Sequence, residues 1–169
     1  MLNQARRLIV ADTGPLVALA VADLLPQTLL HFGELLVPEN VITECLVNLE
    51  NPSAQIISEL LSGASLIVIQ DSKIASFDAA YSSGLGTSEI AVLAYASQYG
   101  HVALIDDERA RKVALRIGVQ TVRSGAIVVA LKRAGLIESI KPALAAWSAH
   151  GYFLTDFVQK QLLVGAGEK

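Results

Sequence analysis

Acidic side chains stand at four points where a predicted strand ends or a predicted helix begins, and these residues have the clearest chemical potential. Carboxylates that share a site raise one another's pKa, so a protein that gathers them usually offsets their charge with a cation. Hard cations such as Mg2+ take oxygen ligands, and once bound they activate water and stabilise phosphoryl transfer. The pattern predicts a metal-dependent enzyme acting on phosphodiesters. The candidate catalytic residues are Asp12, Glu44, Glu89, Asp106 and Asp107.

Each of these acids also has an ordinary structural explanation. Asp12 follows an apolar run directly and is typical of a helix cap. Glu44 resembles any surface glutamate of a helix, and Glu89 in a first helical turn would interact favourably with the helix dipole. We expect one of Asp106 and Asp107 to cap the next helix and the other to reach the metal, and the sequence leaves open which does which.

Polar and basic neighbours of the acids are candidates for contacts with substrate. Thr13 could orient the Asp12 carboxylate or hold a metal-bound water, or it could simply form the turn, and Ser88 could assist Glu89. Residues 8–108 contain thirteen acidic residues and one basic residue, whereas residues 109–141 contain eight basic residues and one acidic residue. An acidic part that could hold metal thus adjoins a basic part, including Arg111 and Lys112, that could position a phosphate backbone.

The composition limits the class of protein. The net charge of −3 argues against tight, passive binding of nucleic acid, and the single Cys45 excludes an intramolecular disulfide framework, so we expect a reducing cytoplasm and a packing role for Cys45. No uncharged apolar run is long enough to span a membrane, and no signal peptide is predicted, because residues 1–7 lead straight into a strand-like run. At 169 residues we expect a single domain, residues 1–169.

Strand-like and helix-like segments alternate, which predicts an α/β fold with a mainly parallel sheet. In such sheets ligands bind beyond the carboxyl ends of the strands, which would bring Asp12 and Asp106–Asp107 into one neighbourhood. Residues 71–81 form a looser stretch that could be helical, and Thr87 or Gly86 should be the N-cap of the helix that follows. The predicted strands are 8–11, 34–37, 66–69, 102–105 and 119–122. The other predicted helices are 16–25, 41–49, 55–61, 107–117, 124–134, 142–150 and 155–163.

Other chemistry finds little support in the chain. The three histidines are isolated, and the Gly84-Leu85-Gly86 segment lacks the following Lys-Ser/Thr of a phosphate loop. No Ser–His–Asp pattern with a nucleophile elbow is present. The nine aromatic residues, four Phe, four Tyr and one Trp, are scattered and predict no stacking platform for bases.

Five segments together resemble the PIN-domain nucleases, in particular the short prokaryotic branch akin to virulence-associated protein C (VapC-like) toxins. Each motif alone is weak, but five in the same order are fairly specific. The resemblance covers about residues 8–154, with a core over about 8–137 and C-terminal helices over about 142–164. The segments are 10–19, 37–38 with Glu44, 85–94, 104–114 and 130–137.

The resemblance implies a Rossmann-like three-layer α/β/α sandwich with about five strands. It also implies an acidic cluster binding Mg2+ or Mn2+, cleavage of RNA, a role as the toxin of a toxin–antitoxin pair and a homodimer. The implied metal ligands are Asp12, Glu89 and Asp106 or Asp107, with Glu44 completing the acidic set. Two positions depart from the branch: Thr87 replaces a usual glutamate, and residues 123–126 replace Gly-Thr-x-Gly, although Ser124 keeps a hydroxyl that could contact phosphate.

The sequence thus favours a Mg2+- or Mn2+-dependent endoribonuclease whose regulator would be a small antitoxin protein that shields the site. The alternative is a catalytically silent PIN-like module that binds nucleic acid or protein, which the Thr87 departure favours. A small phosphatase or nucleotide-binding protein is a weaker third hypothesis, because Gly14 stands where an aspartyl-phosphate mechanism would need a second Asp.

Overall fold

The computed structural model describes residues 7–169, and their strands form a single parallel sheet in the order β3-β2-β1-β4-β5. Ile9 of β1 pairs with Leu35 of β2 on one side and with Val102 of β4 on the other. All five strands predicted from the sequence are present, and no end is shifted by more than two residues. The strands are β1 (Ile9–Ala11), β2 (Leu35–Pro38), β3 (Leu66–Ile69), β4 (Val102–Leu104) and β5 (Thr121–Val122).

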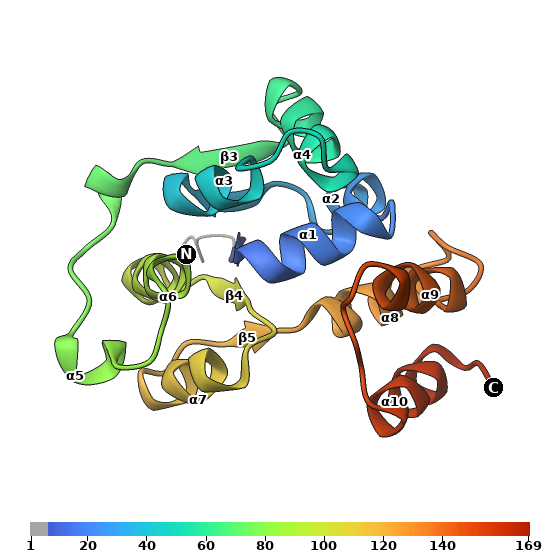
Figure 1. The fold of residues 1–169 in the computed structure, drawn as a ribbon. Helices are drawn as coiled ribbons and strands as arrows, with labels where there is room; N and C mark the ends of the chain where they lie inside the picture. Colours follow the sequence, from blue (N-terminus) through green and yellow to red (C-terminus); the bar gives the residue numbers. More distant parts are fainter. Residues whose placement is uncertain (1–6) are drawn as a thin grey trace, which may run out of the picture.

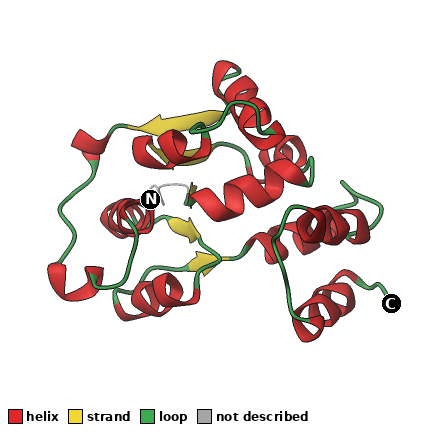
Figure 2. Cartoon of the chain, in the orientation of Figure 1, coloured by secondary structure: helices red, strands yellow, loops and turns green. Residues whose placement is uncertain are grey.

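Helices flank the sheet on both faces, which confirms the three-layer α/β/α architecture (Figures 1 and 2). Helix α6 packs against β1, β2 and β4, α4 packs against β3, and α1 packs against α3, α4 and α8. The helices are α1 (Thr13–Val21), α2 (Leu25–Phe32), α3 (Glu39–Cys45), α4 (Pro52–Ser62), α5 (Ala79–Ser82), α6 (Thr87–Tyr99), α7 (Glu108–Arg116), α8 (Ser124–Arg133), α9 (Lys141–Ala149) and α10 (Asp156–Ala166), with a short 3-10 turn at Asp71–Lys73.

The connections place a topological switch between β1 and β4. The chain runs outward from β1 through β2 to β3, and then returns through α5 and α6 to add β4 on the opposite side of β1. The loops after β1 and β4 therefore leave the same edge of the sheet in different directions, which opens a crevice where ligands of parallel sheets commonly bind. Asp12 ends β1 and Asp106 lies shortly after β4, so both face this crevice region.

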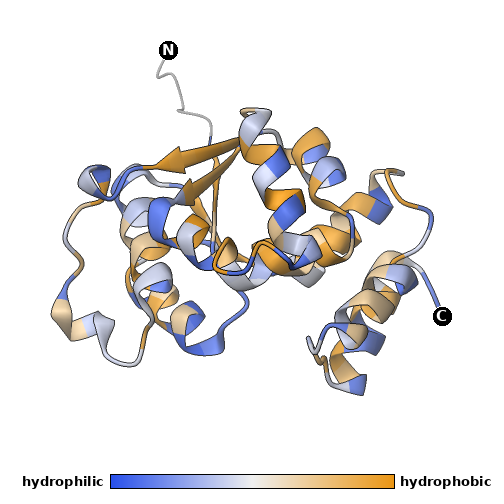
Figure 3. Cartoon of the chain, turned by 45° about the horizontal axis from the view of Figure 1, so that its top comes forward, coloured by the Kyte–Doolittle hydropathy of each residue, from blue (hydrophilic) through white to orange (hydrophobic). Residues whose placement is uncertain are grey.

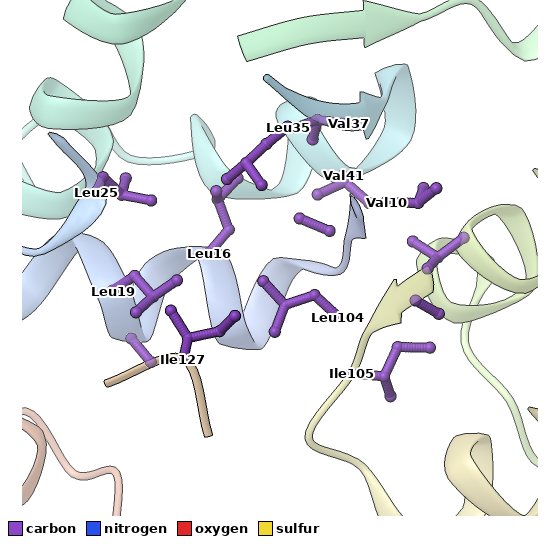
Figure 4. Close-up of a cluster of buried hydrophobic side chains, with 14 of the residues drawn as sticks. Val10, Leu16, Leu19, Leu25, Leu35, Val37, Val41, Leu104, Ile105 and Ile127 are labelled. Carbon is purple, nitrogen blue, oxygen red and sulfur yellow. The ribbon is translucent and has the colours of Figure 1, made fainter. Parts of the chain in front are cut away.

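The core is built from the apolar strands and the buried residues of the helices. Figure 3 shows strands in the orange of hydrophobic residues. Figure 4 shows side chains from β1, β2, β4, α1 and α8 meeting in one cluster. Cys45 also belongs to this core at 8% exposure, which confirms its predicted packing role. Burial raises the pKa of its thiol to about 12, and the charges of Glu44 and Asp12 act in the same direction, so the thiol stays protonated.

Two predicted helices end four residues earlier than expected, whereas α4 begins three residues before its predicted start and α10 ends three residues after its predicted end. The predicted helix 16–25 begins earlier, at Thr13, and ends at Val21, because Asp23 adopts a left-handed conformation with φ of 55° and Pro26 starts the separate helix α2. The predicted helix 41–49 spans Glu39–Cys45, and Leu49, one of the apolar residues that suggested a longer helix, is 59% exposed. Gly86 is the N-cap of α6, which resolves the choice between Gly86 and Thr87.

Among the described residues, no single helix has the length and apolar character to cross a membrane. Helices α1 and α2 pass such a test only as a pair, and they are bent by 114° at the break between them. The prediction that the chain has no signal peptide concerns residues 1–6, which lie outside the described part, and the assignment of residues 1–169 to a single domain stays a prediction.

Candidate active site

Asp12 lies at the carboxyl end of β1, where its backbone N–H donates a hydrogen bond of 3.0 Å to the carbonyl oxygen of Leu104. It occupies the N-cap position of α1, yet its side chain accepts no capping hydrogen bond. The residue is only 7% exposed, and its Oδ1 atom is buried without a hydrogen-bond partner among the described residues. The ordinary explanation of Asp12 as a helix cap therefore fails, and a buried carboxylate oxygen is left free.

The pKa of Asp12 shows which charges surround it. Burial is the largest cause that raises this pKa from its ordinary value of 3.8 to about 7. A hydrogen bond from the Thr13 backbone opposes the shift, and the charges of Glu89, Glu44 and Asp106 add to it. Three of the other predicted acids thus lie near enough to act on Asp12. The sheet brings them together from α6, α3 and the loop after β4.

Glu44 joins two helix starts. Its Oε2 atom accepts a hydrogen bond of 2.7 Å from the Thr13 hydroxyl at the start of α1, and its Oε1 atom accepts one from the Ser88 hydroxyl at the start of α6. Ser88 itself is 4% exposed. Glu44 is therefore no free surface glutamate. The hydroxyls of Thr13 and Ser88, predicted to assist Asp12 and Glu89, instead donate to Glu44 and hold it in place.

Glu89 lies in the first turn of α6. Its Oε2 atom accepts a hydrogen bond of 2.8 Å from the backbone N–H of Gly86, the residue that caps this helix. A carboxylate near a helix N-terminus is also favoured by the helix dipole. The helix start thus fixes Glu89 and turns it toward the loop that precedes α6, while its charge still reaches Asp12.

The two adjacent aspartates after β4 have different partners. Asp107 caps α7, because its Oδ1 atom accepts a hydrogen bond of 2.9 Å from the backbone N–H of Ala110. Asp106 accepts two hydrogen bonds from Ser124, one of 2.9 Å from the backbone N–H and one of 2.7 Å from the hydroxyl, and a third from the Tyr152 hydroxyl. Ser124, predicted to contact phosphate, is 1% exposed and here directs both of its donors to Asp106.

Tyr152 is the residue that sequence reasoning missed. It lies in the loop between α9 and α10, and burial raises the pKa of its phenol, with the charge of Asp106 and the hydrogen bond to that carboxylate adding to the shift. The Tyr152 ring packs beside Trp147, with 5.5 Å between ring centroids, and the indole N–H of Trp147 donates a 2.7 Å hydrogen bond to the Ala18 carbonyl in α1. The C-terminal helices are thereby tied to the acidic site.

Three basic residues line two neighbouring cavities. Arg111 and Arg123 line a cavity that also contains Asp106, and both pair with Glu108, Arg111 across 3.8 Å. Lys112 instead lines a second cavity, which Arg111, Leu115 and Gln120 also line. The structure thus brings Arg111 beside the acidic site but does not bring Lys112 there.

The donor set fits a hard divalent cation in its chemistry. The acids and hydroxyls predicted for the site all offer oxygen atoms, and Asp12 Oδ1 is a buried acceptor that lacks a donor among the described residues. Within residues 7–169, however, no three His, Cys, Asp or Glu side chains are already arranged as ligands of one ion. In this arrangement the carboxylates of Glu44, Glu89 and Asp106 accept hydrogen bonds from protein donors.

No curated protein matches the chain. The sequence model of a family described as PIN domain matches residues 8–168, nearly the whole chain. PIN domains are generally nucleases and typically use divalent metals. The parallel five-stranded sheet and the acids at its carboxyl edge agree with this match, and the chain therefore belongs to the PIN domain family.

Proposed function

We propose that the chain is a Mg2+- or Mn2+-dependent endoribonuclease. The observation that carries this proposal is Asp12, a carboxylate that is almost fully buried, lacks a partner for Oδ1 and feels the charges of three other acids. Such an arrangement destabilises the folded protein unless a positive charge nearby offsets the negative charges. A cation bound there relieves this cost, which gives the acids a reason to be gathered.

Asp12, Glu89 and Asp106 would hold the metal, and Glu44 would complete the acidic set. When bound, the metal lowers the pKa of a water molecule and stabilises charge on the scissile phosphate. Thr13 and Ser88 fix both oxygens of Glu44, and Ser124 fixes both oxygens of Asp106. We leave Asp107 out of the ligand set, because its cap of α7 already gives it a structural role.

Arg111 is the basic residue best placed to hold the RNA backbone. It lies one helical turn from Asp107 and lines the cavity that contains Asp106, and its Nε–H donates to Thr121. Phosphate contacts of this kind fix the register of a nucleic acid without reading its sequence. Lys112 would act only on more distant phosphates, because it lines the neighbouring cavity.

The direct test is cleavage of a pool of total RNA by purified protein, with Mn2+ or Mg2+ against EDTA and with the Asp12→Asn variant as control. We expect metal-dependent cutting by the wild type and none by the variant. Sequencing the new ends identifies the substrate. Cleavage by Asp12→Asn at the wild-type rate would exclude the mechanism.

A second candidate function is a silent module that binds nucleic acid or protein without cleaving it. Thr87 favours it, since a carboxylate is usual at this position in the branch that the sequence resembles, and so does the absence of a ready set of three metal ligands in the described chain. Calorimetric titration with Mn2+ separates the two functions. Binding that disappears in Asp12→Asn supports the nuclease, whereas no binding at millimolar Mn2+ supports the silent module.

We also propose that the enzyme acts as the toxin of a toxin–antitoxin pair and forms a homodimer. The support for the toxin role is the sequence resemblance alone. Apolar side chains at the surface support self-association, among them Leu30 at 74% and Val47 at 81% exposure. Arrest of growth on expression of the wild type but not of Asp12→Asn tests the toxin role. Sedimentation of the purified protein tests the dimer, which a monomer at micromolar concentration would exclude.

A further inference from the structure

A cavity of about 490 Å³ opens beside Asp106, between the start of α8, the loop after α9 and helix α10. We call it the α8–α10 pocket. Its volume falls within the range of about 300–1,000 Å³ that is common for small-molecule sites. Figure 1 shows α8, α9 and α10 gathered at one end of the molecule, beside α1 and α2 and away from α5. Its lining includes Asp106, Arg123, Ala126, Tyr152, Phe153 and Leu162.

The floor of the pocket is apolar because α10 approaches α8 closely. A side chain at Gly125 would place its Cβ 2.9 Å from the nearest methyl group of Leu162, so glycine at this position allows the contact. Ala126, Leu154 and Val158 continue the apolar lining. A flat, uncharged group could therefore lie here with little loss of hydration.

Aromatic side chains stand around this floor, although the sequence predicted no stacking platform. Trp147, Tyr152 and Phe153 all line the pocket. Phe153 is 79% exposed, which is unusual for so large an apolar side chain, and it offers a free ring face for stacking. Stacking on aromatic rings is the usual way in which proteins hold unpaired bases, and it tolerates any base.

The other wall of the pocket is basic. Arg111 and Arg123 share one carboxylate, that of Glu108, so the three side chains carry a net positive charge. The Nε atom of Arg123 is buried and has no hydrogen-bond partner among the described residues. A buried donor without an acceptor is unfavourable, and a phosphate or carbonyl oxygen of a ligand would satisfy it.

We propose that the α8–α10 pocket receives one unpaired nucleobase of the RNA strand next to the bond that is cut, a role that rests on the ribonuclease function proposed above. The base stacks against Phe153 and Tyr152, and its phosphate meets Arg111 and Arg123. Asp106 belongs both to the pocket and to the acidic site, so a base held here places the adjoining phosphate at the acids. We expect the substrate to be single-stranded, because a paired base would first have to unpair and unstack, which costs free energy that an unpaired base does not pay.

Binding can be measured without catalysis. Trp147 is the only tryptophan of the chain and lines the pocket, so its fluorescence reports on the ligand directly. The wild type is titrated in EDTA with each of the four nucleoside 5′-monophosphates and, as a matched probe without a base, with ribose 5-phosphate. We expect saturable quenching by the nucleotides and affinity for ribose 5-phosphate lower by about tenfold or more, the usual worth of stacking one base.

Two variants locate the binding. Ala126→Phe fills the pocket from an exposed position of α8, and Ala145→Phe adds the same ring to an exposed position of α9 outside the pocket lining. We expect nucleotide affinity to fall by about tenfold or more in the first and to remain unchanged in the second. Phe153→Ala removes an exposed ring and should keep the fold. We expect it to weaken nucleotide binding as well. This variant tests the pocket even if Ala126→Phe does not fold.

The outcomes separate this role from the nuclease function. Nucleotide binding by Asp12→Asn at wild-type affinity, with cleavage lost, supports both. If the wild type binds nucleotides but cleaves no RNA, the base pocket is supported and the nuclease function is contradicted. Equal responses to nucleotides and ribose 5-phosphate, or wild-type affinity in both Ala126→Phe and Phe153→Ala, would overturn the base pocket even if cleavage is observed.

Discussion

The ends of β1 and β4 are neighbours in the sheet, and each is followed by an aspartate of the acidic site, yet the two carboxylates have opposite surroundings. Asp12 is buried, and its Oδ1 atom accepts no hydrogen bond. Asp106 accepts three hydrogen bonds, from the backbone and hydroxyl of Ser124 and from Tyr152. The Asp12 carboxylate is left for a ligand. The Asp106 carboxylate is held by the start of α8 and by the loop after α9.

The difference teaches how a metal site can be both prepared and stable. A site of free carboxylates would repel itself, whereas a site in which every oxygen is satisfied would have little reason to bind a cation. In this fold, stability of the site and attraction for a cation come from different residues. Glu44, Glu89 and Asp106 are positioned by hydroxyl and N–H donors, and Asp12 keeps the unsatisfied oxygen.

The largest expected effect comes from neutralising either aspartate. We expect Asp12→Asn and Asp106→Asn each to lower the rate of RNA cleavage by at least about 100-fold, because a metal contributes several kcal/mol to the transition state. The rate is measured on a single RNA from the cleaved pool at saturating Mn2+. If one variant no longer cleaves RNA and the other cleaves at the wild-type rate, then only one of the two aspartates takes part in cleavage.

Asp12 should also make the stability of the folded protein depend on pH. The pKa of Asp12 is raised in the folded protein from 3.8 to about 7, so the folded state binds more protons than the unfolded state between these values. Its contribution to stability is full below about pH 4, declines as the pH rises through 7, and amounts to as much as about 4 kcal/mol.

Urea denaturation of the metal-free protein in EDTA tests this from pH 4 to pH 8. Wild type should lose stability over this range, and Asp12→Asn, which cannot ionise, should lose less and be the more stable protein at pH 8. Mn2+ at pH 8 should restore stability to the wild type and not to the variant, because a ligand of the native state stabilises it. Parallel pH curves for the two proteins would show that Asp12 ionises as freely as in the unfolded chain.

The contrast between the strand ends also shows what the sequence could predict. The order of strands and helices followed from apolar runs and turn residues, and acids directly after strands had to lie at one edge of a parallel sheet. The bend between α1 and α2 could not be predicted, because it depends on a left-handed conformation at Asp23. Tyr152 could not be predicted either, since it lies 46 residues from Asp106 and follows no local pattern, and only the packing of α9 and α10 brings it there.

A smaller effect should follow from loosening Asp106 without removing its charge. Tyr152→Phe and Ser124→Ala each delete one hydroxyl donor. We expect the affinity for Mn2+ and the cleavage rate each to fall by about tenfold or more, as is usual when a group that orients a metal ligand is lost. Calorimetry gives the affinity, and Thr155→Ala, which deletes a hydroxyl that caps α10 instead, serves as the control. If Tyr152→Phe and Ser124→Ala both bind Mn2+ with the wild-type affinity, then these two hydroxyls do not orient Asp106 for metal binding.

The smallest effect separates Asp106 from its neighbour. Asp107→Ala removes the cap of α7 and should lower the free energy of unfolding by about 1 kcal/mol, whereas Asp107→Asn keeps a good capping side chain and should be nearly neutral. We expect both variants to cleave RNA within about twofold of the wild-type rate, a difference that corresponds to less than about 0.5 kcal/mol in the barrier. Chemical denaturation and cleavage assays on the same preparations check this. If Asp107→Asn is as stable as the wild type but no longer cleaves RNA, then Asp107 is a ligand as well as a cap, and the end of β4 supplies two carboxylates to the site where the end of β1 supplies one.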